Sequence, residues 1–418
     1  MSLVRAAADP AAVPAPSKPV GYVAHVLAQA DPDTYVRLIQ DGGASSLRDD
    51  ISWASVEATE GTFDWSGPDR IVSEAAAHHL HVLMVVDTTP AWASGASTSA
   101  GDWYWLPPRR PATYGAFAAA VAARYRAGGT FWREHRRLPQ YLPAAIELWN
   151  EENLSGSWGL RTPSPALYAA MVKAAYARIK RADPAMTVLI GGLAPAGGYN
   201  DVTCSGRRNH GHDSTSWNEV NYLQALYAHG IHGHFDAVAW HPYSFWQGAT
   251  ASQMLSYNRC SAWTQMAGTR ISARSLMVAH GDGRKRIWIT EAGAPTCIRR
   301  ADYACVSPAQ QAYLATREAR IWQHFSWAGG YYWYDIRDDN LGIAQGVSHF
   351  GAVLSDNRPK PAYYALHRAW RRVHHSLSSY QPTPAFCDSH RLWQRSSKAR
   401  RVTCARRLNP PGSHLARR

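Results

Sequence analysis

The sequence contains no run of eighteen or more apolar residues, so no membrane span is expected. Residues 1–19 are rich in Ala and Pro and lack the continuous hydrophobic stretch of an intact signal peptide, which predicts a linker of the kind that follows one. The six cysteines include no CxxC pair, and no Cys/His cluster has zinc-binding spacing. Their even number favours disulfides in an exported protein over free buried thiols.

Acidic residues are nearly absent from the C-terminal end. From Arg371 onward the chain has eleven Lys and Arg but a single acid, so this segment carries most of the net charge of +13. A charge confined to a tail is a weak indication of nucleic-acid binding, and no nucleic-acid partner is expected. Residues 375–418 are predicted to be a basic appendage, either closed by a disulfide or disordered, that is solvated or associates with anionic polymers.

Phenylalanine is scarce, with 8 Phe against 18 Trp and 21 Tyr. Aromatic rings with a polar edge suit walls that are both apolar and hydrogen-bonding, as in a carbohydrate cleft. Packing in the core or at its rim explains any single Trp equally well. The composition therefore favours a carbohydrate partner without identifying the residues that bind it.

A phosphate-binding glycine turn is missing after the first expected strand, which argues against a doubly wound open sheet. Eight short apolar segments alternate with amphipathic helical segments over residues 20–374. The expected strands lie within 20–27, 45–53, 81–90, 144–153, 187–194, 235–245, 284–293 and 329–340. This alternation predicts an α/β fold, a (β/α)8 TIM barrel whose top face carries long loops at 91–110 and 195–216.

Polar residues follow the expected strands at the end where such barrels do their chemistry. Glu151 ends the fourth strand and Glu291 the seventh, so the two acids are expected to face each other across the barrel mouth. Paired carboxyl groups are what glycosidic hydrolysis requires: one protonates the leaving oxygen, and the other attacks the anomeric carbon or activates water. No metal or cofactor is needed for this chemistry, and the glycine-spaced histidines at 210–214 and 229–234 are interpreted as solvated loop residues.

Several motifs resemble those of clan A glycoside hydrolases. "LWNEEN" is similar to their "WNEPN" signature, and "IWITEAG" to the segment that carries their nucleophile. The phrases "VVDTTPAWA", "AWHPYSF" and "FGAVLSDNRPKPAYYAL" extend the resemblance over roughly residues 20–372, closest to the family 39-like bacterial glycosidases. The motifs occur in this order on alternating barrel strands, which makes their combination more specific than any one of them.

The resemblance implies a role for each matching residue. Glu151 matches the acid/base and Glu291 the nucleophile, which is expected to stay ionised beside a cation. The acid/base must instead be protonated at the working pH, which requires surroundings that raise its pKa. Asn150 matches the residue that binds the sugar 2-hydroxyl. Arg48 resembles the arginine beneath the nucleophile, with a simple pairing to Asp50 as the alternative.

Five further residues are expected to contact substrate or to orient the nucleophile. His241 and Tyr243 fall where the family has sixth-strand residues with these roles, although a lone histidine is more often a core residue. Trp333 resembles the aromatic floor of the −1 subsite, which holds the sugar whose bond is cut. Trp92 and Asp335 follow the third and eighth strands and complete the expected substrate-binding set.

Two other glutamates lie beside these residues. Glu147 is deeper in the fourth strand and is interpreted as structural. Glu152 stands where many relatives have Pro, so it either points away from the cleft or biases the choice of substrate. The sequence alone leaves this open.

The sequence therefore predicts a retaining glycoside hydrolase that cleaves β-linked oligo- or polysaccharides, acts outside the cell or in its envelope, and is a monomer. Residues 1–19, 20–374 and 375–418 are expected to be linker, catalytic domain and tail. A barrel that binds carbohydrate without catalysis and a transglycosylase using the same residues are the alternatives. The sugar and its linkage stay open, as does endo or exo action.

Overall fold

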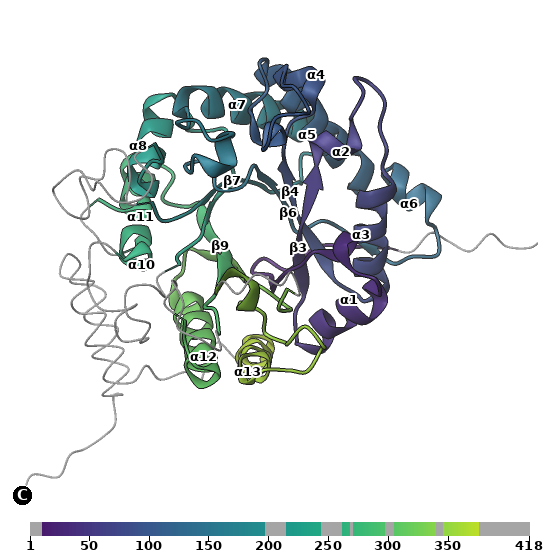
Figure 1. Ribbon diagram of the computed structural model, residues 1–418, viewed down its shortest axis with the longest axis vertical. Coiled ribbons are helices and arrows are strands. Elements are labelled where there is room, and N and C mark those ends of the chain that lie inside the picture. The colour runs from purple at the N-terminus through teal and green to yellow at the C-terminus, as the bar shows by residue number, and fades with distance from the viewer. Residues whose placement is uncertain are drawn as a thin grey trace, which may run out of the picture.

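The computed structural model describes residues 11–196, 215–243, 261–267, 271–296, 305–339 and 346–375. Eight parallel strands close into a barrel in the order β10-β2-β3-β4-β6-β7-β8-β9 (Figure 1). The strands are β2 (Val20–Val23), β3 (Ser46–Ser52), β4 (His81–Asp87), β6 (Ala145–Leu148), β7 (Val188–Leu193), β8 (Ala237–Trp240), β9 (Arg286–Ala292) and β10 (Ala328–Trp333). The predicted (β/α)8 barrel is confirmed, and the doubly wound alternative is excluded because its sheet would not close.

Apart from β3, which carries Arg48, Asp49 and Asp50, the strands are largely apolar because both of their faces are buried. Side chains of one parity fill the barrel interior, and those of the other parity pack against the helices. The interior cluster is formed by Val23, Leu83, Ala145, Leu189, Ala237, Ala239, Trp288 and Tyr332. The larger outer cluster takes the alternate positions, so strand parity alone tells which way a side chain at the barrel mouth points.

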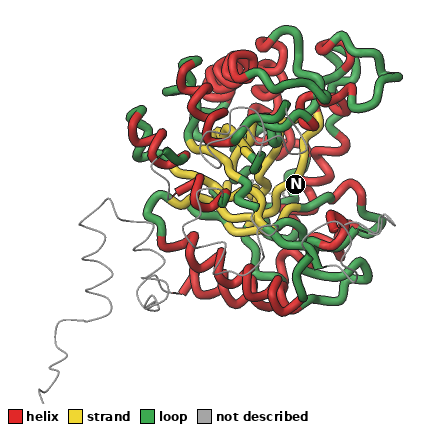
Figure 2. The backbone as a smooth tube through the Cα atoms, turned by 60° about the vertical axis from the view of Figure 1, so that its left-hand side comes forward, coloured by secondary structure: helices red, strands yellow, loops and turns green. Residues whose placement is uncertain are grey.

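Helices surround the barrel on its outside, as Figure 2 shows from a second direction. The principal helices are α1 (Pro32–Asp41), α3 (Ser66–Ala77), α5 (Pro111–Tyr125), α7 (Pro165–Ala182), α8 (Glu219–Ala228), α11 (Ala273–Ala279), α12 (Pro308–His324) and α13 (Pro361–His375). Five of them begin with Pro, at a position where the missing N–H costs nothing. Ser164 and Ser307 cap α7 and α12 by accepting backbone hydrogen bonds, so the local sequence fixes where these helices start.

Shorter elements lie between these units. They are β1 (Ala12–Val13), α2 (Trp53–Val56), α4 (Ala91–Ser94), α6 (Thr130–Glu134), β5 (Gln140–Tyr141) and α10 (Ala262–Ala267), with 3₁₀ turns at 26–28, 103–105, 156–158 and 346–349. β1 pairs in parallel with β5, so part of the expected N-terminal linker belongs to a two-stranded sheet separate from the barrel. The domain boundaries themselves stay a prediction.

Several remaining expectations concern residues outside the described ranges, the cysteines and membrane spans. The basic tail after residue 375 lies outside the described residues, as do most of the 195–216 loop and the histidines at 210–214. Cys305 is the only cysteine among the described residues, and it takes part in a disulfide. Disulfide pairing and export stay predictions. No helix within the described ranges is long and apolar enough to cross a membrane.

Candidate active site

The turn after β6 presents two polar residues at the barrel mouth. Trp149 and Glu151 have positive φ angles of 73° and 50°, and Asn150 lies between them. Such angles are strained for residues with a side chain and persist where the surroundings enforce them. The Trp149 indole is buried and donates to the Ser157 carbonyl at 2.8 Å, which anchors the turn. The strain is therefore held in place by packing behind the site.

Glu291, near the end of β9, is held by two hydrogen-bond donors. Its Oε1 accepts from the Arg48 guanidinium at 2.7 Å, and its Oε2 accepts from the Tyr243 hydroxyl at 2.7 Å. Burial alone would raise the pKa of Glu291, but His241, Arg48 and the Tyr243 hydrogen bond outweigh it and lower that pKa. Glu291 is thus an ionised carboxylate with a fixed orientation.

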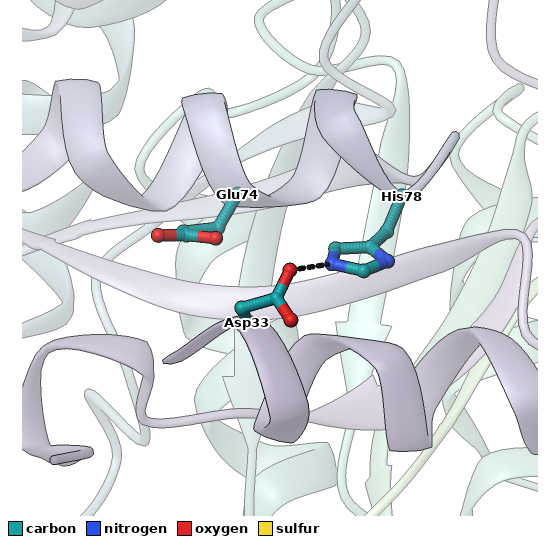
Figure 3. A group of neighbouring side chains, drawn as sticks. All are labelled: Asp33, Glu74 and His78. Atoms are coloured by element: carbon teal, nitrogen blue, oxygen red, sulfur yellow. Dashed lines mark hydrogen bonds and ion pairs between the residues drawn. The ribbon is translucent and has the colours of Figure 1, made fainter. Parts of the chain in front are cut away.

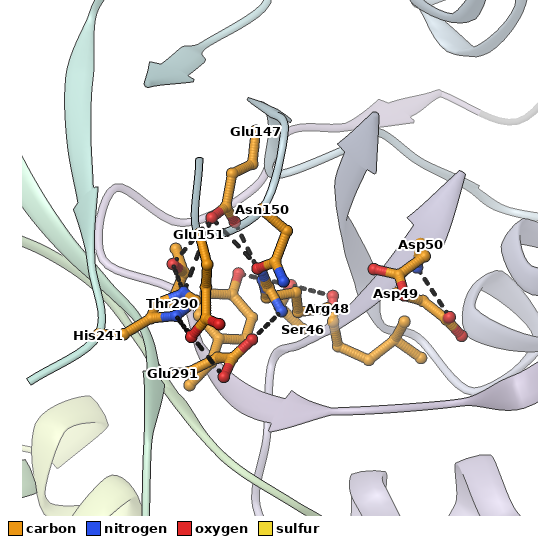
Figure 4. A network of polar contacts seen from close by, with 12 residues as sticks. Ser46, Arg48, Asp49, Asp50, Glu147, Asn150, Glu151, His241, Thr290 and Glu291 are labelled. Atoms are coloured by element: carbon orange, nitrogen blue, oxygen red, sulfur yellow. Dashed lines mark hydrogen bonds and ion pairs between the residues drawn. The ribbon is translucent and has the colours of Figure 1, made fainter. Parts of the chain in front are cut away.

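Arg48 connects three groups from two strands (Figure 4). Besides Glu291, its Nε donates to Glu147 Oε2 at 3.0 Å, and its second terminal nitrogen donates to Asn150 Oδ1 at 2.8 Å. Arg48 is 2% exposed and Glu147 is completely buried. Arg48 thus lies beside Glu291, and among the described residues no hydrogen bond joins it to Asp50. Glu147 has the structural role that was predicted, because it pairs with Arg48 from within β6, deeper in the barrel than the mouth.

His241 lies between the two facing acids. Its Nδ1 is 3.0 Å from Glu151 Oε1 and 3.6 Å from Glu291 Oε2, and its Nε2 is 3.1 Å from Thr290 Oγ1. Thr290 in turn donates to Glu147 at 3.0 Å. One atom each of Glu151, His241 and Glu291 lie within 4.8 Å of one another. The sequence-predicted pair of acids is therefore brought together with the histidine between them.

A glycine of β7 makes this arrangement possible, and the sequence reasoning missed it. Gly192 has φ +84°, and a Cβ at that position would lie 2.8 Å from Glu147 Oε1. His241 Nε2 and the Glu151 backbone N would each be 3.4 Å away. The "IGG" of the fifth strand was the available signal, since consecutive glycines in a buried strand indicate close approach by another group.

The prediction for Trp333 is wrong by one residue. Trp333 is completely buried in the outer cluster, so it cannot touch a sugar. Tyr332 faces the interior, and by alternation Tyr334 faces inward at the mouth. The Tyr334 ring is 6.3 Å from that of Tyr243 and 5.4 Å from that of Phe350. Tyr334 therefore takes the place that Trp333 was expected to have at the mouth, next to Tyr243. The segment "YYWYD" has aromatic residues at both odd and even positions, so the pattern could not tell which of them face inward.

Asp335 and Trp92 are placed by protein contacts. Asp335 is 4% exposed, and its Oδ2 lies 3.2 Å from Nε2 of His25, a residue the sequence reasoning missed. Burial would lower the pKa of His25, but Asp335 above all, with Asp49 and Asp50, raises it to about 10. Trp92 donates to the Glu57 carbonyl at 2.8 Å and is half-buried. Sugar contact by Asp335 and Trp92 stays a prediction.

Glu152 points away from the cleft, which answers the question its departure from Pro raised. It is completely buried, and neither carboxyl oxygen has a geometrically acceptable hydrogen bond. Burial raises its pKa well above the usual value, and Glu147 and Glu151 add to the rise. The side chain is therefore a neutral acid behind the site.

A second group of potential metal ligands lies on the outside of the barrel. Asp33 of α1 faces Glu74 of α3 and His78, the residue that follows α3 (Figure 3). Asp33 Oδ1 is 2.9 Å from His78 Nε2, and its other oxygen pairs with Arg37. These protein partners account for the group, whose members are exposed or half-buried.

Comparisons with known proteins identify the fold. No family model matches the chain, and no curated protein does. A family 39 glycoside hydrolase from the gut symbiont Bacteroides cellulosilyticus WH2 is similar over 85% of this chain, with TM-score 0.58 and 19% identity. The match spans 64% of that enzyme, less than two thirds of its length.

Two further solved structures have the same barrel. A GH39 β-xylosidase from Caulobacter crescentus is similar over 87% of this chain and 72% of its own, with TM-score 0.55 and 17% identity. A GH5_18 protein from Streptomyces cattleya, solved with GlcNAc, matches 88% of this chain and 83% of its own, with TM-score 0.58 and 16% identity. The chain thus has the barrel fold found in clan A glycoside hydrolases.

Proposed function

We propose that this chain is a retaining glycoside hydrolase that cleaves β-linked oligo- or polysaccharides. The observation that carries the proposal is the pair Glu151 and Glu291, whose nearest oxygens lie within 4.8 Å and whose partners differ. Retaining enzymes have carboxyl groups about 5–5.5 Å apart, whereas inverting ones leave roughly 6.5–9.5 Å for water. The solved structures with this barrel include a β-xylosidase and a family 39 glycoside hydrolase, which supports the same chemistry.

The two acids divide the reaction between them. Glu291, ionised and held by Arg48 and Tyr243, attacks the anomeric carbon while Glu151 gives its proton to the leaving oxygen. The glycosidic C–O bond breaks and a glycosyl ester of Glu291 forms. Glu151 then takes a proton from water, whose oxygen attacks the same carbon and releases Glu291. Two inversions leave the anomeric configuration unchanged.

The neighbouring residues position these groups. Asn150 is held by Arg48 through its Oδ1, and its amide N–H groups, which donate to none of the described residues, can meet a sugar hydroxyl. His241 contacts Glu151 directly and couples it to Thr290 and Glu147 behind the site. Tyr334 and Tyr243 offer aromatic surface on which a sugar ring packs. This arrangement favours catalysis over mere sugar binding, because a binding protein has no use for two differently partnered acids.

The test is a screen of aryl β-glycosides and polysaccharides with wild type and Glu291→Gln. Loss of a nucleophile is expected to lower kcat by about 10⁴-fold or more. Glu134→Gln is the matched control. It makes the same change in charge at an exposed residue of α6, which precedes β6 at the end of the barrel away from the two acids. Proton NMR of the first product should show the retained anomer. Equal activity in wild type and Glu291→Gln would contradict the role of Glu291, and the inverted anomer would contradict the mechanism.

Three further proposals accompany this one. The enzyme is exported, acts as a monomer, and carries its basic tail as an accessory that associates with anionic polymers.

A transglycosylase is the second candidate, since a sugar hydroxyl can replace water at the same glycosyl ester. Product analysis at high acceptor concentration separates the two.

A further inference from the structure

Asp50 is a carboxylate that faces the barrel mouth and has no partner among the described residues. It lies two residues beyond Arg48 on β3, so the two side chains share the interior face, with Asp50 roughly 6–7 Å nearer the opening. Figure 4 shows its carboxyl group on the side of Arg48, while that of Asp49 points away. Asp50 is exposed, and no hydrogen bond or ion pair engages its carboxylate within the described ranges.

Asp87 is a second such group on the neighbouring strand. It ends β4, where its register partner is Ser52 of β3, and strand parity with Leu83 turns it inward. Asp87 is 3% exposed, and its Oδ1 has no hydrogen-bond partner among the described residues. A buried acceptor left without a donor is costly, which is reason to look for a ligand that supplies one. We call Asp50 and Asp87 the acidic wall.

The cationic side chains at the barrel mouth are paired with groups other than Asp50 and Asp87. Arg48 donates to Glu147, Glu291 and Asn150, and His25 pairs with Asp335. In the part of the chain that the structure describes, no cation forms an ion pair with the acidic wall. Burial raises the pKa of Asp87 well above its usual value, and Asp50 and Glu147 raise it further against the pull of Arg48. With its pKa raised this far Asp87 is held as a neutral acid, as Glu152 is, so the exposed Asp50 is the charged member of the acidic wall.

We propose that the acidic wall selects the sugar of the −1 subsite by charge: it accepts sugars that donate hydrogen bonds from hydroxyl or ammonium groups and rejects uronic acids. The inference rests on the proposed glycosidase function and adds a substrate class to it. Asp50 lies on β3 beside Arg48, and Arg48 contacts the Glu291 carboxylate, so a sugar over Glu291 comes within reach of Asp50. A sugar carboxylate there would face the like charge of the Asp50 carboxylate, which has no proton to donate to it.

The experiment compares matched substrates that differ in one group. Each neutral aryl β-glycoside hydrolysed in the screen is paired with its C6-oxidised uronide and its 2-amino-2-deoxy analogue. Wild type is expected to show a kcat/KM for the uronide lower by on the order of 100-fold, because like charges face each other. Asp50→Asn should reduce the difference in kcat/KM between neutral substrate and uronide about tenfold, because an amide does not repel a carboxylate. The same variant should lower turnover of the neutral substrate, because an amide accepts hydrogen bonds from sugar hydroxyls less well than a carboxylate does.

Controls separate charge selection from damage to the fold. Asp183→Asn makes the same substitution in the loop between α7 and β7, at the opposite end of the barrel, and should leave the ratio unchanged. Asp87→Asn supplies a second variant should Asp50→Asn fail to fold. A merely structural role for Asp50 would lower turnover of all three substrates equally and would leave the ratio at its wild-type value.

Each outcome decides the proposal. The proposal is supported if wild type hydrolyses the uronide slowly and Asp50→Asn raises the uronide rate relative to the neutral substrate. The rate with the 2-amino-2-deoxy analogue shows whether ammonium or hydroxyl is preferred. Equal hydrolysis of uronide and neutral substrate, abolished by Glu291→Gln, overturns the charge selection while the glycosidase function stands. A screen in which the wild type hydrolyses no neutral glycoside or polysaccharide overturns the glycosidase function and the charge selection with it.

Discussion

The barrel mouth contains two kinds of carboxyl group, those with protein partners and those without. Glu147 and Glu291 share the guanidinium of Arg48, and Glu151 contacts His241. Asp50 and Asp87 lie on neighbouring strands and meet no such donor in the described residues. Partnered acids have their ionisation and orientation set in advance, which suits chemistry. Unpartnered acids gain their hydrogen bonds only when a ligand arrives, which suits recognition.

The largest expected effect tests the catalytic member of the partnered set. Glu151→Gln removes the proton that the leaving group needs, so substrates with poor leaving groups should lose about 10²–10⁴-fold in rate. Nitrophenyl glycosides, whose leaving group departs without protonation, should lose far less in the bond-breaking step. Single-turnover rates across a series of leaving groups measure the difference. A uniform loss across the series would remove Glu151 from the acid role.

A smaller effect on stability tests the buried ion pair. Glu147→Gln leaves the buried Arg48 with one carboxylate instead of two, and removing a partner from a buried pair costs about 3–5 kcal/mol. Urea unfolding at neutral pH should show this loss in the free energy of unfolding. Glu134→Gln, whose side chain is 51% exposed, is the surface control and should change that free energy by less than about 1 kcal/mol. Equal effects in the two variants would mean that Glu147 is not a structural partner.

The smallest effect tests the unpartnered glutamate behind the site, and its sign depends on pH. The folded protein keeps Glu152 protonated because burial raises its pKa, while the unfolded chain releases that proton above its usual pKa of 4.5. Wild type therefore loses stability as pH rises above this value. Glu152→Gln does not titrate, so its stability relative to wild type should increase with pH. Thermal unfolding at pH 5 and pH 8 measures the trend, and a difference independent of pH would contradict it.

The sequence was sufficient for the barrel, because eight apolar segments separated by amphipathic helices have few other solutions. It also located Glu151, Glu291, Arg48 and His241 at strand ends, since parallel strands bring their carboxyl ends to one face. The aromatic floor was misplaced because "YYWYD" has an aromatic residue at both parities, and only the register with β2 and β9 shows that Trp333 faces outward.

Hydrogen-bond partners were decided by tertiary structure alone. Asp49 and Asp50 are consecutive and chemically identical, yet Asp49 accepts from the Val26 backbone at 2.9 Å while Asp50 faces the mouth with no donor from the described part of the chain. Glu151 and Glu152 differ in the same way across a turn with positive φ angles. The sequence determines that carboxyl groups gather at this end of the barrel, because their positions along the strands are local. Which of them are paired depends on side chains from strands up to 243 residues apart, and only the closed barrel brings these together.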